Sequence, residues 1–157
     1  MNAETNAPPL IRTARLADLE ALLALEQTSF SSDRISRRQY RHHLHSTAAI
    51  VMVAKQSDLL VGSALVLFRR GTRIARLYSL AIAGQARGRG IGRALLDAVA
   101  AKARARSCTR LRLEVRPDNA AAIGLYARAG LVRIGQRPDF YEDGSEAWIY
   151  ELSLAGG

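Results

Sequence analysis

GQARGRGIGR, residues 84–93, is the stretch of this 157-residue sequence that decides the fold. It follows an apolar, β-rich run at residues 74–82 and precedes Ile91, Leu95 and Val99, which recur at helical spacing. A glycine-rich loop therefore joins a strand to a helix. Backbone N–H groups at a helix N-terminus have no intrahelical acceptor and lie at the positive end of the helix dipole, so residues 88–93 are suited to bind a diphosphate.

Two common phosphate-binding loops are excluded by the spacing of these glycines. The dinucleotide fingerprint GxGxxG needs a glycine five positions after Gly88, where the sequence has Arg93, and a P-loop needs a Gly-Lys pair, which does not occur here. The remaining pattern, Gln85-x-x-Gly88-x-Gly90, resembles the Gln/Arg-x-x-Gly-x-Gly/Ala motif of the GNAT superfamily of N-acetyltransferases. A tight strand-to-helix turn without a ligand is the alternative interpretation.

Hydrophobic periodicity predicts the elements on both sides of this loop. Strands are expected at residues 10–13, 49–55, 59–68, 74–82, 111–115, 131–134 and 147–154, and helices at residues 16–26, 37–44, 91–103 and 120–129. This order predicts an α/β fold with a GNAT-like mixed, mainly antiparallel central sheet of about seven strands flanked by four helices. We expect one N-acetyltransferase domain at residues 10–154, preceded by a flexible tail at residues 1–9.

The resemblance to GNAT enzymes implies acetyl-CoA as the cosubstrate and no metal. It assigns the pyrophosphate of coenzyme A to the loop formed by Arg87, Gly88, Arg89, Gly90, Ile91, Gly92 and Arg93. It also implies that the backbone of Leu80, Ala81 and Ile82 pairs with the pantetheine arm as an extra strand. Within the family, the strands that here carry Ile82 and Leu113 splay apart and leave backbone groups for the cofactor.

LEVRPDNAAAIGLY, residues 113–126, closely resembles the corresponding stretch of the ribosomal-protein-alanine N-acetyltransferases. In those enzymes a glutamate is the general base and a tyrosine protonates the coenzyme thiolate, which implies these roles for Glu114 and Tyr126. A carboxylate in an otherwise apolar strand is costly unless it is paired or functional. The alternatives are a salt bridge from Glu114 to Arg112 or Arg116, and simple core packing for Tyr126.

Two further site residues follow from the same resemblance. Asn119 is expected to cap the next helix and also to contact coenzyme A. RPDFYEDG, residues 137–144, resembles the family's tyrosine-containing loop, which helps to wall the peptide-binding cleft. Tyr141 is therefore expected to bind the acceptor together with Glu114, and an aromatic pair that merely anchors the loop is the alternative.

The acceptor is expected to be a primary amine. An α-amine has a pKa near 8 and a lysine amine about 10.4, so an α-amine needs less help to lose its proton. We therefore favour a protein or peptide N-terminus, such as that of a ribosomal protein. The formal net charge of +9, with all but Lys55 and Lys102 of the 23 basic residues being arginine, argues against polycationic acceptors. A small-molecule amine acetyltransferase and a non-catalytic ribosome- or RNA-binding module with the coenzyme A fold remain alternatives.

Several other classes are excluded or disfavoured. No apolar run approaches the 20 or so residues of a membrane span, the N-terminus does not resemble a secretory signal, and the one cysteine, Cys108, has no partner, so we expect a cytoplasmic protein. No RNA-recognition or helix-turn-helix motif occurs, so nucleic acid is not expected to be the direct substrate. His42, His43 and His45 lack the spacing of a metal site. The oligomeric state stays open.

Overall fold

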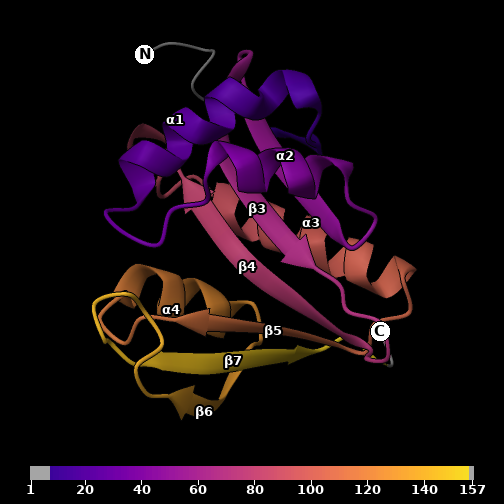
Figure 1. Ribbon diagram of the computed structural model, residues 1–157, viewed down its shortest axis with the longest axis vertical. Helices are drawn as coiled ribbons and strands as arrows, with labels where there is room; N and C mark the ends of the chain where they lie inside the picture. Colours follow the sequence, from indigo (N-terminus) through magenta and orange to yellow (C-terminus); the bar gives the residue numbers. More distant parts are fainter. Residues whose placement is uncertain (1–7, 156–157) are drawn as a thin grey trace.

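The computed structural model describes residues 8–155, in which a seven-stranded sheet carries helices on both faces (Figure 1). In chain order the elements are β1 (Leu10–Thr13), α1 (Leu19–Ser29), α2 (Arg37–His45), β2 (Ala49–Gln56), β3 (Leu59–Leu67), β4 (Ile74–Ile82), α3 (Ile91–Ala105), β5 (Arg110–Val115), α4 (Ala120–Arg128), β6 (Val132–Arg137) and β7 (Ala147–Ser153). The predicted mixed, mainly antiparallel sheet is confirmed. Most of the tail expected at residues 1–9 falls outside the described residues.

The strand order is β1-β2-β3-β4-β5-β7-β6, and β4 with β5 forms the one parallel pair of neighbours among the described strands. In Figure 1, α1 and α2 lie over one face of β3 and β4, and α3 runs behind these strands. The crossover from β4 to β5 contains α3, as parallel neighbours require. The glycine-rich loop is therefore held at the carboxyl end of β4.

The two N-terminal helices are fixed by capping groups. The helix expected from residue 16 begins as a 3₁₀ turn, Leu16–Asp18, whose terminal carboxylate accepts the backbone N–H of Arg15 at 2.7 Å. At the start of α2, the Ser36 hydroxyl accepts the N–H of Gln39 and the Gln39 side chain accepts the N–H of Ser36, at 3.1 and 2.8 Å. This capping box confirms the predicted role of Ser36 and fixes the chain direction between α1 and α2.

The central feature of the sheet is a fork between β4 and β5. The two strands pair from Ile74 with Arg110 as far as Leu77 with Leu113, and no pairing follows in the described residues. A bulge lies at this point, because Leu77 and Ser79 of β4 face consecutive residues of β3 and Tyr78 is the extra residue. A bulge bends its strand and increases the local twist. The expected splaying is therefore confirmed, and the bulge accounts for it.

The strand β5 presents different chemistry to the two faces of the sheet. Leu111, Leu113 and Val115 are buried in the main core. Arg112 and Glu114 alternate with them and lie on the opposite face, as the two-residue period of a strand requires. The polar side chains of β5 therefore lie on the face of the sheet opposite the main core.

Candidate active site

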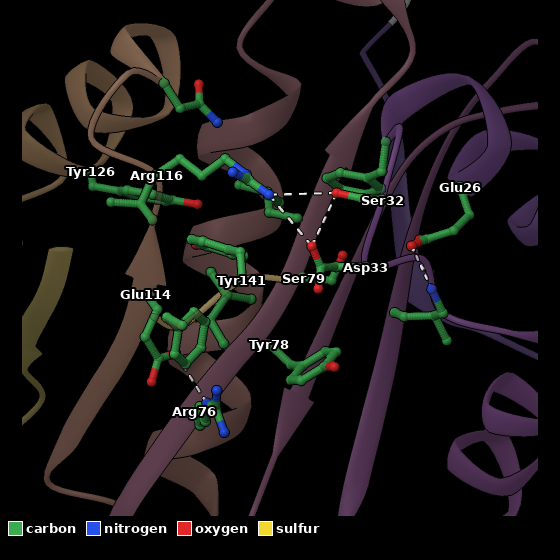
Figure 2. A pocket seen from close by; sticks show the side chains of 17 residues that line it. Glu26, Ser32, Asp33, Arg76, Tyr78, Ser79, Glu114, Arg116, Tyr126 and Tyr141 are labelled. Carbon is green, nitrogen blue, oxygen red and sulfur yellow. Dashed lines mark hydrogen bonds and ion pairs between the residues drawn. The ribbon is translucent and has the colours of Figure 1, made fainter. Parts of the chain in front are cut away.

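The fork between β4 and β5 opens into a cavity of about 330 Å³ (Figure 2). The connection between α1 and α2, the strands β4 and β5, the start of α4 and the β6–β7 loop all contribute to its wall. Among the residues predicted from sequence, the cavity brings together Leu80, Glu114, Asn119, Tyr126 and Tyr141. Figure 2 shows Glu114 and Tyr126 on one side of this cavity and Glu26 on the other.

Glu114 lies in the cavity wall with its side chain 6% exposed. Its Oε2 accepts a hydrogen bond from Arg76 Nε at 3.1 Å, and its Oε1 lies 4.0 Å from Arg137 Nη1. Glu114 therefore does form a salt bridge, but the predicted partners, Arg112 or Arg116, are wrong. Both of those guanidiniums bind other carboxylates. Residues two apart on a strand are roughly 7 Å apart, so neighbouring strands supply closer partners.

Tyr126 reaches the cavity from α4 and is almost completely enclosed. Its ring lies 6.4 Å from the ring of Tyr150, at an interplanar angle of 45°. Burial, and to a smaller extent the neighbouring Tyr141, raises the pKa of Tyr126 far above that of a free tyrosine. The hydroxyl is therefore protonated at physiological pH and is available as a proton donor.

The glycine-rich loop has the geometry of an anion site. Gly88 and Gly90 adopt φ values of +77° and +79°, and a Cβ at either position would meet no atom within 4 Å, so the backbone is open to a ligand. Gly90 is the N-cap of α3 with no side-chain cap, and the first backbone bond of the helix runs from Ala94 N–H to Gly90 C=O. The amides between them, which include Gly92 and Arg93, point toward any diphosphate bound at this helix end.

The other residues predicted to bind coenzyme A do not all lie at the same cavity. Leu80 lines the cavity, whereas Ala81 is buried in the core and Ile82 lies with Arg87 on a second hollow of about 620 Å³ beside α1. The Arg93 side chain donates to Asp97 Oδ1 at 3.0 Å and to the carbonyl oxygen of Arg128 at 3.4 Å, so it connects α3 with the end of α4. The predicted cap is confirmed at α4, where the Asn119 side chain accepts the N–H of Ala122 at 3.2 Å.

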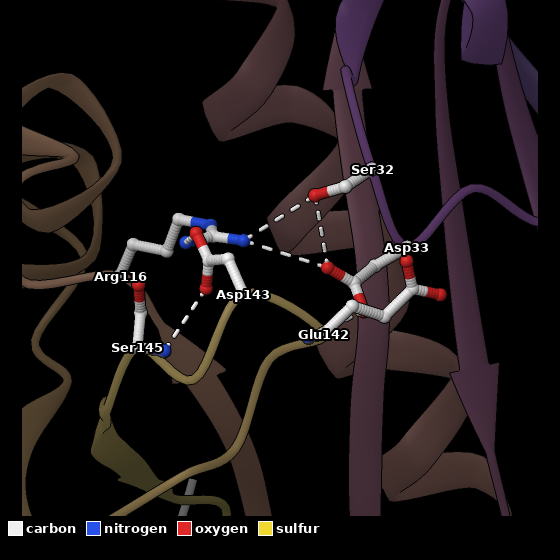
Figure 3. Close-up of polar contacts among 6 residues, drawn as sticks. All are labelled: Ser32, Asp33, Arg116, Glu142, Asp143 and Ser145. Carbon is white, nitrogen blue, oxygen red and sulfur yellow. Dashed lines mark hydrogen bonds and ion pairs between the residues drawn. The ribbon is translucent and has the colours of Figure 1, made fainter.

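Arg116 joins two loops over the cavity (Figure 3). Its Nη1 donates to Asp143 Oδ2 at 2.9 Å, its Nη2 lies 3.4 Å from Asp33 Oδ2, and the N–H of Glu142 donates to Asp33 Oδ1 at 3.3 Å. The same guanidinium lies 4.1 Å from the ring centre of Tyr141. Burial raises the pKa of Tyr141 to about 12 against the opposing effect of Arg116. We call this group, Arg116 with Asp33, Tyr141, Glu142 and Asp143, the Arg116 clasp.

Glu26 is a buried carboxylate that the sequence analysis did not assign to the site. Its Oε2 accepts the N–H of Ile35 at 2.8 Å, and its Oε1 accepts the hydroxyl of Tyr40 at 3.1 Å. Burial raises the pKa of Glu26 despite these two hydrogen bonds. The sequence does indicate that Glu26 is unusual, because it lies on the apolar face of its helix with Leu19 and Leu22. A carboxylate on such a face requires hydrogen-bond partners. These bonds fix the α1–α2 connection at the cavity wall.

The histidines of α2 make local contacts. His42 and His43 meet edge to face with ring centres 5.5 Å apart, and His45 Nδ1 lies 2.8 Å from the backbone oxygen of Arg41. Across residues 8–155, no three His, Cys, Asp or Glu side chains converge as metal ligands would. The helices within this range are also too short or too polar to cross a bilayer.

Comparison with known sequence families gives the same result as the forked sheet and the glycine-rich start of α3. Residues 16–131 match the Acetyltransferase (GNAT) family, which is well over half of the chain. The protein therefore belongs to the GNAT family of acetyltransferases.

Two relatives with named activities are similar in sequence, and one solved structure with a named activity is similar in fold. N-alpha-acetyltransferase 30 of Schizosaccharomyces pombe is 30% identical over 124 residues, which cover 77% of this chain and 83% of that protein. A candidate ribosomal protein bS18-alanine N-acetyltransferase of Bacillus subtilis is 28% identical over 136 residues, with 87% and 89% covered. The crystal structure of the ribosomal-protein-S18-alanine N-acetyltransferase from Escherichia coli superposes with a TM-score of 0.83 at 25% identity, covering 96% of each chain.

A longer relative also matches nearly the whole chain. The uncharacterized protein ML0378 of Mycobacterium leprae is 31% identical over 153 residues, or 92% of this chain. This chain spans 40% of the length of that relative.

Proposed function

We propose that this protein transfers the acetyl group of acetyl-CoA to the α-amine of a protein or peptide N-terminus. One observation carries the proposal: the Glu114 carboxylate and the Tyr126 hydroxyl line the same cavity, at the point where β4 and β5 part. An amine and a thioester that meet there have a proton acceptor and a proton donor in one enclosure. The relatives named for N-terminal and ribosomal-protein-alanine acetylation support this acceptor class.

The residues along the fork fit coenzyme A. Beyond Leu77, the described part of β4 pairs with β3 on one side and has no partner strand on the other, so its residues 80–82 can bind an extended arm by strand addition. The amides at the start of α3 can hold the diphosphate, with Gly88 and Gly90 allowing close approach. Asn119, the N-cap of α4, also lines the cavity. When bound, acetyl-CoA supplies the acyl group as a thioester.

Glu114 and Tyr126 then divide the proton transfers. Glu114 takes a proton from the acceptor ammonium, directly or through water, and passes it to solvent, so that the nitrogen lone pair can attack the thioester carbonyl. It then takes the second proton from the nitrogen as the amide forms. Tyr126 donates its hydroxyl proton to the sulfur as the carbon–sulfur bond breaks. Backbone N–H groups at the free edge of β4 can stabilise the negative charge that develops on the carbonyl oxygen. Solvent returns the lost proton to Tyr126 and removes the extra one from Glu114.

The walls of the cavity favour the end of a chain as acceptor. The Arg116 clasp closes two loops over the cavity and sets the Tyr141 ring in its wall. An extended N-terminus can enter such a site with its amine foremost. At pH 7 about a tenth of an α-amine population is already neutral, so one carboxylate is an adequate base.

A panel of acceptors tests the proposal. The purified protein is incubated with acetyl-CoA and peptides with free N-termini, N-terminally blocked peptides that contain lysine, or small amines, and the release of free thiol is measured. We expect transfer to free N-termini. Transfer to small amines alone would establish the small-molecule alternative, and binding of coenzyme without any transfer would establish a non-catalytic module.

A further inference from the structure

Two arginines from different strands share the carboxylate of Glu114. Arg76 of β4 lies 3.1 Å from this carboxylate and Arg137 of β6 lies 4.0 Å from it, and their side chains are 38% and 52% exposed. The structure gives neither arginine a second carboxylate among residues 8–155. This local cluster therefore holds two guanidiniums and one carboxylate, and Arg76 is the guanidinium of the two that lines the cavity.

The position of Arg76 is fixed by more than this ion pair. Its guanidinium carbon lies 5.5 Å from the ring centre of Tyr78 and 6.0 Å from that of Phe140, and all three residues line the cavity. Aromatic faces attract a guanidinium and restrict its movement. Arg76 is thus held beside Glu114 while part of its surface stays accessible from the cavity.

This arrangement disfavours an acceptor that brings only a positive charge. An ammonium that approaches Glu114 meets the Arg76 guanidinium in the cavity wall and competes with Arg76 and Arg137 for the same carboxylate, and like charges at a few ångströms repel strongly in a partly enclosed site. A carboxylate on the same acceptor removes the conflict. It can pair with the Nη groups of Arg76 while Arg76 Nε keeps its hydrogen bond to Glu114, so that the acceptor adds one charge of each sign to the cluster.

We infer that the acceptor carries a carboxylate close to its reactive amine, and that Arg76 recognises this carboxylate. The inference rests on the proposed function and narrows its substrate class to acidic N-termini. Three successive contacts of about 3 Å, from amine to Glu114 to Arg76 to acceptor, together with about 2 Å across the carboxylate and about 2 Å across the guanidinium, place the acceptor carboxylate within about 13 Å of the amine nitrogen. Because an extended chain advances about 3.5 Å per residue, an Asp or Glu at the first or second position fits.

Matched peptides that differ in one side chain test the inference. One series carries Asp, Asn or Lys at the second position and another carries Asp or Asn at the first, and kcat and KM are measured for each peptide. A charge-assisted hydrogen bond predicts that the wild-type protein prefers Asp over Asn by about 10- to 100-fold in kcat/KM, mainly through KM, with Lys poorer still. Arg76→Gln should remove the preference, and Arg76→Lys should restore part of it.

Arg112→Gln is the control, because Arg112 binds Glu151 on the same face of the sheet and lies outside the cavity. This variant should keep the preference for Asp. A wild-type protein without charge preference, or an Arg76→Gln variant that retains the preference, would overturn the inference and leave the proposed function intact. A wild-type protein that acetylates no peptide in the panel would overturn both.

Discussion

Replacing Glu114 with glutamine separates its proposed role in catalysis from its role in the fold. General-base catalysis contributes roughly 10²- to 10⁴-fold. For an α-amine the loss should fall near the lower end, about 100-fold at pH 7, because about a tenth of the amine is neutral without help. The loss should shrink toward pH 9 as the amine deprotonates unaided. Initial rates of thiol release across this pH range, at saturating acetyl-CoA, measure the effect.

The cost of the same change to stability should be small. Glutamine keeps an oxygen for Arg76, and the two arginines that lose a carboxylate are 38% and 52% exposed and stay hydrated. An ion pair of this exposure contributes about 1 kcal/mol or less, so Tm should fall by roughly 2–4 °C at most. Coenzyme binding, measured by calorimetry, should be unchanged.

Glu151→Gln is a matched control for this experiment. Glu151 is also a strand carboxylate with an 8% exposed side chain and two guanidinium partners, Arg110 at 2.6 Å and Arg112 at 2.7 Å. It does not line the cavity. This variant should lose comparable stability and keep full activity. If Glu114→Gln acetylates at the wild-type rate at pH 7, the carboxylate is not the base and the reasoning from the cavity fails.

Four further outcomes are expected. Tyr126→Phe should lower kcat about 10- to 100-fold with little change in KM or Tm, measured by steady-state kinetics and thermal unfolding. Gly90→Ala forces a side chain into the left-handed region at a cost of about 1–2 kcal/mol and should weaken coenzyme binding measured by calorimetry. Arg116→Gln should raise the peptide KM by releasing Tyr141, with kcat changed less. Burial raises the pKa of Glu151, but its two arginine partners outweigh this and hold the pKa below its usual range. The stability it contributes is present above about pH 4.3 and is lost as pH falls through the folded pKa, so Tm of Glu151→Gln should fall less than that of wild type below about pH 4.

Local sequence patterns were sufficient to predict the elements that we propose hold coenzyme A. Gly88 and Gly90 have the positive φ values that a tight strand-to-helix turn needs, and Asn119 caps α4 as its position before Ala120 predicts. These features depend on backbone conformation within a few residues. The same holds for the strands, because their boundaries follow from alternation and turn residues.

Contacts between distant segments could not be derived in this way. Arg76 and Glu114 are 38 residues apart, and Arg116 and Asp33 are 83 apart. With 23 basic residues in the chain, nothing in the sequence ranks these two arginines above the others as partners for a site carboxylate. The ranking comes from the strand order and from the bulge at Tyr78, which decides where β4 leaves β5.

The same charge pattern therefore has two different consequences along β5. Glu151 with Arg110 and Arg112 lies where β4 and β5 are still paired, so this cluster lies on a continuous part of the sheet, outside the cavity, and we expect it to act on stability. Glu114 with its two arginines lies one step beyond the last pair, where the strands part and the cavity opens. At Glu151, a carboxylate held by two arginines is an ordinary structural feature. At Glu114, under the proposed function, the carboxylate meets the acceptor, and we infer that Arg76 beside it selects that acceptor.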